Sequence, residues 1–207
     1  MKTVNMLLPR IVSLAALVFV AANAGATDTA IERVAVGTCA NCHGPEGRSI
    51  APQFPVLAGQ HANYLVAQMH AFKEQTRADP DAIGYMWGMA APLSDSEIAA
   101  LADYYSLQHA SAGSRDKPAL IEHGRDIYRN GLASEGIPAC VSCHGAQALG
   151  TEMYPRLAGQ HAQYLLKQLQ SFQRNLRDVA VMHGVAAGLK VDEMKAVAAY
   201  LQSLGGG

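Results

Sequence analysis

The hexad CANCHG at residues 39–44 returns as CVSCHG at residues 140–145, and the two hexads contain all four cysteines of the chain. Each hexad separates two cysteines by two residues and follows the second cysteine directly with histidine and glycine. On a helical turn, side chains three positions apart lie on the same face. The repeated hexad therefore predicts two equivalent sites, each built from two sulfur atoms and one imidazole.

The histidine after each cysteine pair decides between several chemistries. A CxxC pair alone serves thiol redox centres, zinc sites and iron–sulfur clusters, whereas CxxCH is typical of covalent c-type haem attachment. The alternatives are one zinc site shared by four thiolates, or one disulfide in each pair, and neither uses the histidines. We expect two covalently bound haem c groups, with the histidines as axial iron ligands. The expected residues are Cys39, Cys42 and His43 for one haem, and Cys140, Cys143 and His144 for the other.

The duplication extends beyond the hexads. The sequence LAGQHA stands at residues 57–62 and again at residues 157–162, and residues 86–98 align without a gap with residues 182–194. Between the copies, residues 111–118 (SAGSRDKP) lack apolar periodicity and are typical of a linker. We expect a signal peptide at residues 1–26, an N-terminal domain at 27–110, a linker at 111–118 and a C-terminal domain at 119–207.

The start of the chain is typical of an export signal. Lys2 and Arg10 precede the nearly all-apolar residues 11–22, and small residues follow at positions 22–26. The alternative is an uncleaved membrane anchor, but the apolar run is shorter than the ~20 residues that span a bilayer. We therefore predict a periplasmic protein with no transmembrane segment in the mature chain, free or peripheral at the inner membrane.

Charge argues against a nucleic-acid partner. Without Lys2 and Arg10, 14 basic residues face 17 acidic ones, a balance of 14 minus 17, or −3. Residues 27–110 carry 4 basic and 9 acidic side chains (−5), whereas residues 119–207 carry 8 and 7 (+1). This difference can orient partner docking, and it predicts a lower reduction potential for the N-terminal centre.

The periodic segments predict an all-α fold. Residues 60–72 and 160–172 place apolar side chains three and four positions apart, as one helical face requires. Ser94 and Glu97 form the pattern of a capping box, which predicts a helix over residues 95–108, with a counterpart over 191–204 that lacks this cap. Shorter helices are expected before each hexad, and no segment alternates as a strand does.

The duplication also selects candidates for the sixth iron ligand. Met86 and Met182 are the one methionine pair that occupies equivalent positions in the gapless block. His61 and His161 are also present in both copies and remain rival ligands. Met89 is a further rival in the N-terminal half.

Together these motifs resemble those of the dihaem cytochrome c4 family. Two CxxCH hexads, each followed by P-x-L-A-G-Q and then by M-x-G-[MV]-A-A-x-L, occur in the same order and cover essentially the whole mature chain. The resemblance implies two tandem class I cytochrome c domains, each wrapped around one haem, packed with the haem propionate edges facing each other. It assigns His43 with Met86 and His144 with Met182, and it implies that the carbonyls of Pro55 and Pro155 accept hydrogen bonds from the histidines.

We therefore predict an electron-transfer protein rather than an enzyme. Its expected donor is a quinol-oxidising respiratory complex, and its expected acceptor is a terminal oxidase or another reductase. The alternatives are a dihaem peroxidase, in which one iron loses its distal ligand, and a haem subunit of a larger respiratory complex.

Overall fold

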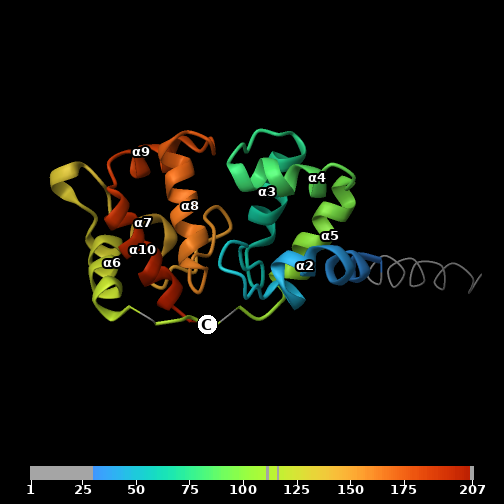
Figure 1. The fold of residues 1–207 in the computed structure, drawn as a ribbon, viewed down its shortest axis with the longest axis horizontal. Coiled ribbons are helices and arrows are strands. Elements are labelled where there is room, and N and C mark those ends of the chain that lie inside the picture. Colours follow the sequence, from blue (N-terminus) through green and yellow to red (C-terminus); the bar gives the residue numbers. More distant parts are fainter. Residues whose placement is uncertain (1–29, 111, 116, 206–207) are drawn as a thin grey trace, which may run out of the picture.

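Two helical halves lie side by side in the computed structural model, joined by a segment that crosses one edge between α5 and α6 (Figure 1). The structure describes residues 30–110, 112–115 and 117–205. The predicted signal peptide, residues 1–26, lies outside the described residues. We refer to residues 30–110 as the N-terminal half and to residues 117–205 as the C-terminal half.

The N-terminal half contains the predicted helices. Residues 30–43 are helical throughout and end at the first hexad. The last helix of this half begins with the predicted capping box, because the Ser94 amide donates to Glu97 Oε2 at 2.8 Å and the Glu97 amide donates to Ser94 Oγ at 3.3 Å. The elements are η1 (Ala35–Cys39), α2 (Ala40–His43), η2 (Pro45–Gly47), α3 (Ala62–Lys73), η3 (Ala82–Met86), α4 (Trp87–Ala90) and α5 (Asp95–Ser106).

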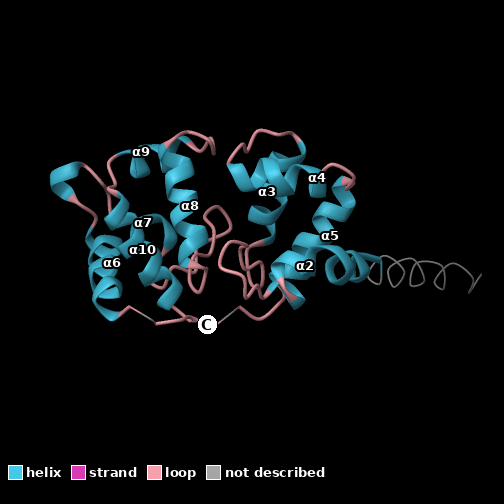
Figure 2. Ribbon diagram, in the orientation of Figure 1, coloured by secondary structure: helices cyan, strands magenta, loops and turns pink. Residues whose placement is uncertain are grey.

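The C-terminal half repeats the order of the helices. Its elements are α6 (Pro118–Asn130), η4 (Ala133–Glu135), α7 (Val141–His144), α8 (Ala162–Gln173), α9 (Ala180–Ala187) and α10 (Val191–Ser203). Its 3-10 turn, η4, precedes the hexad helix, whereas η2 follows it. As expected, α10 begins without a side-chain cap, although the Lys190 amide donates to Glu193 Oε2 at 2.7 Å. The described part of the chain has two isolated bridges but no strand, so the all-α fold class is confirmed (Figure 2).

The core of the C-terminal half is built where α6 crosses α10. Ile127 and Tyr128 from α6 and Met194 from α10 are almost completely buried there. Gly124 lies at the crossing, and a Cβ atom at this position would overlap the backbone of Ala196. Because the two backbones touch, the crossing requires a residue without a side chain.

Gly124→Ala is expected to destabilise the holoprotein by about 1–3 kcal/mol, the usual cost of an overpacked core. The added methyl group must push α6 away from α10, since the atoms that it meets are backbone. Thermal or denaturant unfolding measures the change. His123→Ala, on the exposed side of the same turn, is the control. Equal stability of the Gly124 variant and the parent would contradict the described crossing.

The two halves are joined by amide hydrogen bonds related by a pseudo-twofold axis. Gln160 accepts from the Val56 amide at 2.8 Å and donates to the Val56 carbonyl at 2.9 Å. Gln60 repeats both bonds with Arg156, each at 2.9 Å. Each glutamine side chain thus acts as the hydrogen-bond partner for the backbone N–H and C=O groups of a residue in the other half. These bonds hold the two LAGQHA turns in contact.

A second set of contacts between the halves surrounds Arg77 and Arg177, both of which are buried. The two residues pair as an isolated antiparallel bridge, and the Ala78 amide donates to the Leu176 carbonyl at 2.9 Å. We call the six residues that meet here the arginine cluster. Its members are Tyr64, Gln68, Arg77, Tyr164, Gln168 and Arg177.

Candidate functional site

Both hexads form a single helical turn that a glycine ends. His43 is the last residue of α2, His144 is the last residue of α7, and the glycines that follow have φ values of 75° and 79°. At Gly44 a Cβ atom would lie 2.5 Å from the Arg48 carbonyl oxygen. The glycine therefore lets the chain turn back directly after the histidine.

Each hexad histidine is held by a proline carbonyl, as the resemblance implies. His43 Nδ1 lies 2.9 Å from the Pro55 oxygen, and His144 Nδ1 lies 3.2 Å from the Pro155 oxygen. Since a carbonyl only accepts, the Nδ1 atoms carry the protons, and the unprotonated Nε2 atoms are the ones that could bind a metal. Burial lowers the pKa of both imidazoles. The hydrogen bonds to the proline carbonyls raise the pKa, but by less than burial lowers it. The rings therefore stay neutral, as iron ligation requires.

Aromatic side chains connect the histidine in each half with its surroundings. The ring of Phe54 lies edge-on to His43 at 6.2 Å and to Tyr85 at 5.6 Å between centroids. Tyr154 takes the equivalent place beside His144 at 6.1 Å. Because Tyr85 directly precedes Met86, these contacts bring the methionine segment of the N-terminal half toward its histidine.

No disulfide joins the four cysteines, all of which lie in the described part of the chain. Burial raises the pKa of Cys39, and it raises the pKa of Cys140 to about 11. The two pairs lie in different halves, and within the described ranges no three His, Cys, Asp or Glu side chains gather as a metal site. The alternative of one zinc held by four thiolates therefore has no counterpart in this geometry.

The two candidate methionines are half-buried, and each is followed by an anchored ring. Trp87 Nε1 donates to the Arg77 carbonyl at 2.8 Å, and His183 Nδ1 lies 2.8 Å from the Phe172 carbonyl. Met194 is part of the core, and Met89 is 50% and Met153 83% exposed, but Met69 is half-buried like Met86 and packs in the same cluster. Burial therefore does not separate Met69 from Met86, and the pair Met86 and Met182 stays a prediction from the duplication.

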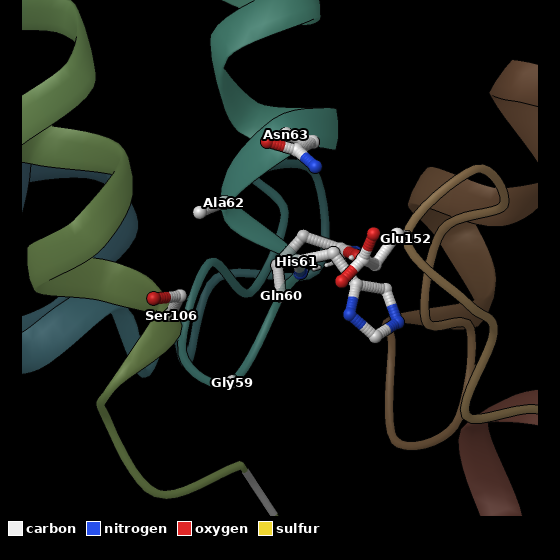
Figure 3. Close-up of a pocket in the computed structure, with 7 residues that line it drawn as sticks. All are labelled: Gly59, Gln60, His61, Ala62, Asn63, Ser106 and Glu152. Carbon is white, nitrogen blue, oxygen red and sulfur yellow. Dashed lines mark hydrogen bonds between the residues drawn. The ribbon is translucent and has the colours of Figure 1, made fainter.

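The rival histidines serve the interface between the halves. His61 Nε2 lies 2.9 Å from the Leu149 carbonyl, and His161 Nε2 lies 2.9 Å from the Ser49 carbonyl. Figure 3 shows the His61 ring beside Glu152 of the other half, in an open cleft of about 340 Å³. Since these nitrogens are already bonded, the structure argues against histidine as the sixth ligand.

Several buried donors lack a protein partner among the described residues. They are Arg156 Nε and Nη2, Gln168 Nε2 and Arg177 Nε, together with the Tyr105 hydroxyl. A buried N–H without an acceptor is costly, so these donors indicate an anionic group near the interface. Two haem propionates would supply such acceptors, and the residues present therefore fit a haem in each half. Gln168 and Arg177 have a signal in the sequence, because Gln68 and Arg77 stand at the same positions one hundred residues earlier, whereas Val56 stands where Arg156 would recur.

Known proteins match this arrangement along nearly the whole chain. The cytochrome c family model matches twice, at residues 29–106 and 121–205. Cytochrome c4 of Azotobacter vinelandii is 40% identical over 190 residues, which is 86% of this chain and 90% of that protein. The structure of reduced recombinant cytochrome c4 from Pseudomonas stutzeri is 38% identical, with a TM-score of 0.76, and covers 87% of this chain and 98% of that one. The structure of Acidithiobacillus ferrooxidans cytochrome c4 is 41% identical, with a TM-score of 0.76, over 80% and 98% of the two chains.

Cys140→Ser combined with Cys143→Ser is expected to halve the covalently bound haem, from two groups per chain to one. The two thioethers of each haem come from one hexad, so the other hexad is unaffected. Intact-protein mass and the haem-to-protein ratio measure the change. Cys39→Ser combined with Cys42→Ser is the matched variant and should give the same ratio with the other haem lost. Two covalent haems in either variant would contradict the assignment.

Proposed function

This chain belongs to the cytochrome c4 family of dihaem electron-transfer proteins, and we propose that it carries electrons in the periplasm between respiratory complexes. It binds two haem c groups covalently, one in each cytochrome c unit. The proposed units are residues 27–110 and 119–207, joined by a linker at residues 111–118. The proposed attachment residues are Cys39, Cys42, Cys140 and Cys143.

The observation that supports this proposal best is that each half contains a hexad histidine held by a proline carbonyl and, later in the chain, a half-buried methionine followed by a hydrogen-bonded ring. We propose His43 and Met86 as the ligands in the N-terminal half, and His144 and Met182 in the C-terminal half. When bound, each haem supplies a one-electron Fe(III)/Fe(II) couple. Two protein ligands leave no position for a substrate, so the chain's task is to hold the metal while one electron arrives and leaves.

The proposed ligands also set the direction of the reduction potentials. Neutral imidazole and soft thioether sulfur favour the ferrous state, as do apolar surroundings, so both potentials should be moderately high. The N-terminal half carries the more negative formal charge, which stabilises the ferric state. We therefore propose that the N-terminal centre has the lower potential.

A peroxidase role finds less support in the site. It requires an open iron position and an acid–base side chain beside it. The histidines that recur in both copies and could fill that task, His61 and His161, are bonded to carbonyls of the opposite half. Electron transfer therefore explains more of the geometry than catalysis does.

The proposed donor is a quinol-oxidising complex, and the proposed acceptor is a terminal oxidase or another reductase. The charge difference between the halves can orient the protein toward two different partners. Within the described residues, no helix has the length and hydropathy to cross a membrane. We propose a periplasmic protein, either free or peripheral at the inner membrane, with the predicted leader removed.

Stopped-flow mixing tests this function. The holoprotein is expected to be reduced by membranes that contain an active quinol-oxidising complex and reoxidised by membranes that contain a terminal oxidase. High salt should slow both reactions if charge steers docking. A protein that is reduced chemically but exchanges no electrons with either membrane preparation would contradict the proposed role.

Met86→Ala and Met182→Ala are each expected to convert one haem from a low-spin to a high-spin ferric state. Loss of the thioether opens one iron position, so cyanide should then bind rapidly to half of the haem. Electron paramagnetic resonance and optical titration measure both changes. Met153→Ala, at an exposed loop position, is the control and should retain the parental spectrum. An unaltered spectrum in both ligand variants would exclude methionine ligation.

A further inference from the structure

The pseudo-twofold symmetry of the interface breaks at one buried charge. Arg77 Nε donates to Asp79 Oδ2 at 2.7 Å, and Asp79 is only 1% exposed. Both Nη atoms of Arg77 are also bonded, to Gln68 at 2.9 Å, to Gln168 at 2.8 Å and to Tyr164 at 3.4 Å. The N-terminal half therefore provides its own counter-ion for its buried guanidinium.

Arg177 lacks such a buried carboxylate, since its chain neighbour Asp178 is exposed and forms no ion pair with it among the described residues. Val179 stands where the offset of 100 places the counterpart of Asp79. The Nη atoms of Arg177 bond to neutral groups of the arginine cluster: to Tyr64 Oη at 2.6 Å, to Gln68 Oε1 at 2.7 Å and to Gln168 Oε1 at 3.1 Å. Arg177 Nε has no partner among the described residues.

A second orphaned donor lies on a side chain that contacts Arg177. Gln168 Nε2 is buried without a partner, while its Oε1 accepts from both arginines. Gln168 is 4% exposed and Arg177 is 6% exposed. A buried cation without a counter-ion is strongly disfavoured, so two adjacent unpaired donors, one of them charged, favour an anion at this position.

Contacts connect this position to the proposed Met182 site. The Arg177 guanidinium lies 4.6 Å from the centroid of the Phe172 ring. The Phe172 carbonyl is bonded by His183, which directly follows Met182. Arg177 also lies on the segment that joins α8 to α9. These contacts connect Arg177 to the segment that carries Met182, and a haem carboxylate is the class of anion that the proposed function would bring to this segment.

We propose that Arg177 and Gln168 bind a propionate carboxylate of the C-terminal haem, and that Asp79 prevents Arg77 from doing the same in the N-terminal half. This inference rests on one part of the proposed function, namely that each half holds a haem. The Arg77 guanidinium is neutralised by a protein carboxylate, and the Arg177 guanidinium is neutralised by the cofactor. Arg177 acts as a cofactor-binding residue that makes the two halves electrostatically unequal.

Val179→Asp tests the proposal while leaving Arg177 in place. An aspartate at this position stands two residues from the arginine, as Asp79 does from Arg77, and should take the guanidinium from the propionate. The propionate bending band in resonance Raman spectra should shift for half of the haem. The redox titration has two steps, and one of them should move to a lower potential by at least about 59 mV. For one electron, this shift equals a tenfold change in the ratio of oxidised to reduced haem. Val179→Asn introduces a side chain similar in size to aspartate but without charge, and it should change neither the Raman band nor the potential.

Two further variants keep the test decisive. Asp79→Asn removes the competing carboxylate and should raise the other step of the titration. Arg177→Gln should shift the same Raman band as Val179→Asp, whereas Arg174→Gln, three residues away on the exposed surface, should not.

The proposal is overturned if Val179→Asp and Val179→Asn behave alike, or if Val179→Asp and Asp79→Asn move the same step. It is also overturned if Arg177→Gln leaves the band unchanged while added chloride shifts the parental potential, because a small ion would then occupy the site. None of these measurements uses a membrane partner. Failure of this proposal is therefore distinguishable from failure of electron exchange.

Discussion

The hydrogen bond from each hexad histidine to a proline carbonyl is the interaction on which the rest of the structure depends. The bonds to Pro55 and Pro155 place the proton on Nδ1 and leave Nε2 free. Burial keeps both imidazoles neutral, and the glycine that follows turns the chain toward the proline. If either bond were absent, the ring could rotate and Nε2 would no longer point in a fixed direction.

The interface between the halves uses the same turns for a different purpose. LAGQHA follows directly from the proline segment, so its glutamine and histidine are carried to the surface where the halves meet. Gln60 and Gln160 close amide pairs, and His61 and His161 bond to opposite carbonyls. One repeated motif thereby connects the orientation of each histidine to the packing of the two halves.

Duplication produces symmetry, and single substitutions then remove it locally. Arg77 and Arg177 occupy equivalent buried positions. Asp79 lies two residues after Arg77 and bonds to it, whereas Val179 lies two residues after Arg177. Because a buried charge is weakly screened, this one difference matters more than several exposed charges. Two centres with the same ligands can therefore differ in potential without any change to the ligands themselves.

The sequence by itself determined the helices, the repeated order and the haem chemistry, because these depend on local spacing. CxxCH lies on one helical turn, the apolar faces recur every three or four residues, and Ser94 caps α5 through Glu97. Repetition alone could not separate methionine from histidine as sixth ligand, since both recur. Tertiary structure showed that His61 and His161 bond to carbonyls of the opposite half, and it revealed the inequality of the two arginines. Those properties arise from contacts between residues about one hundred positions apart, whose partners no local pattern specifies.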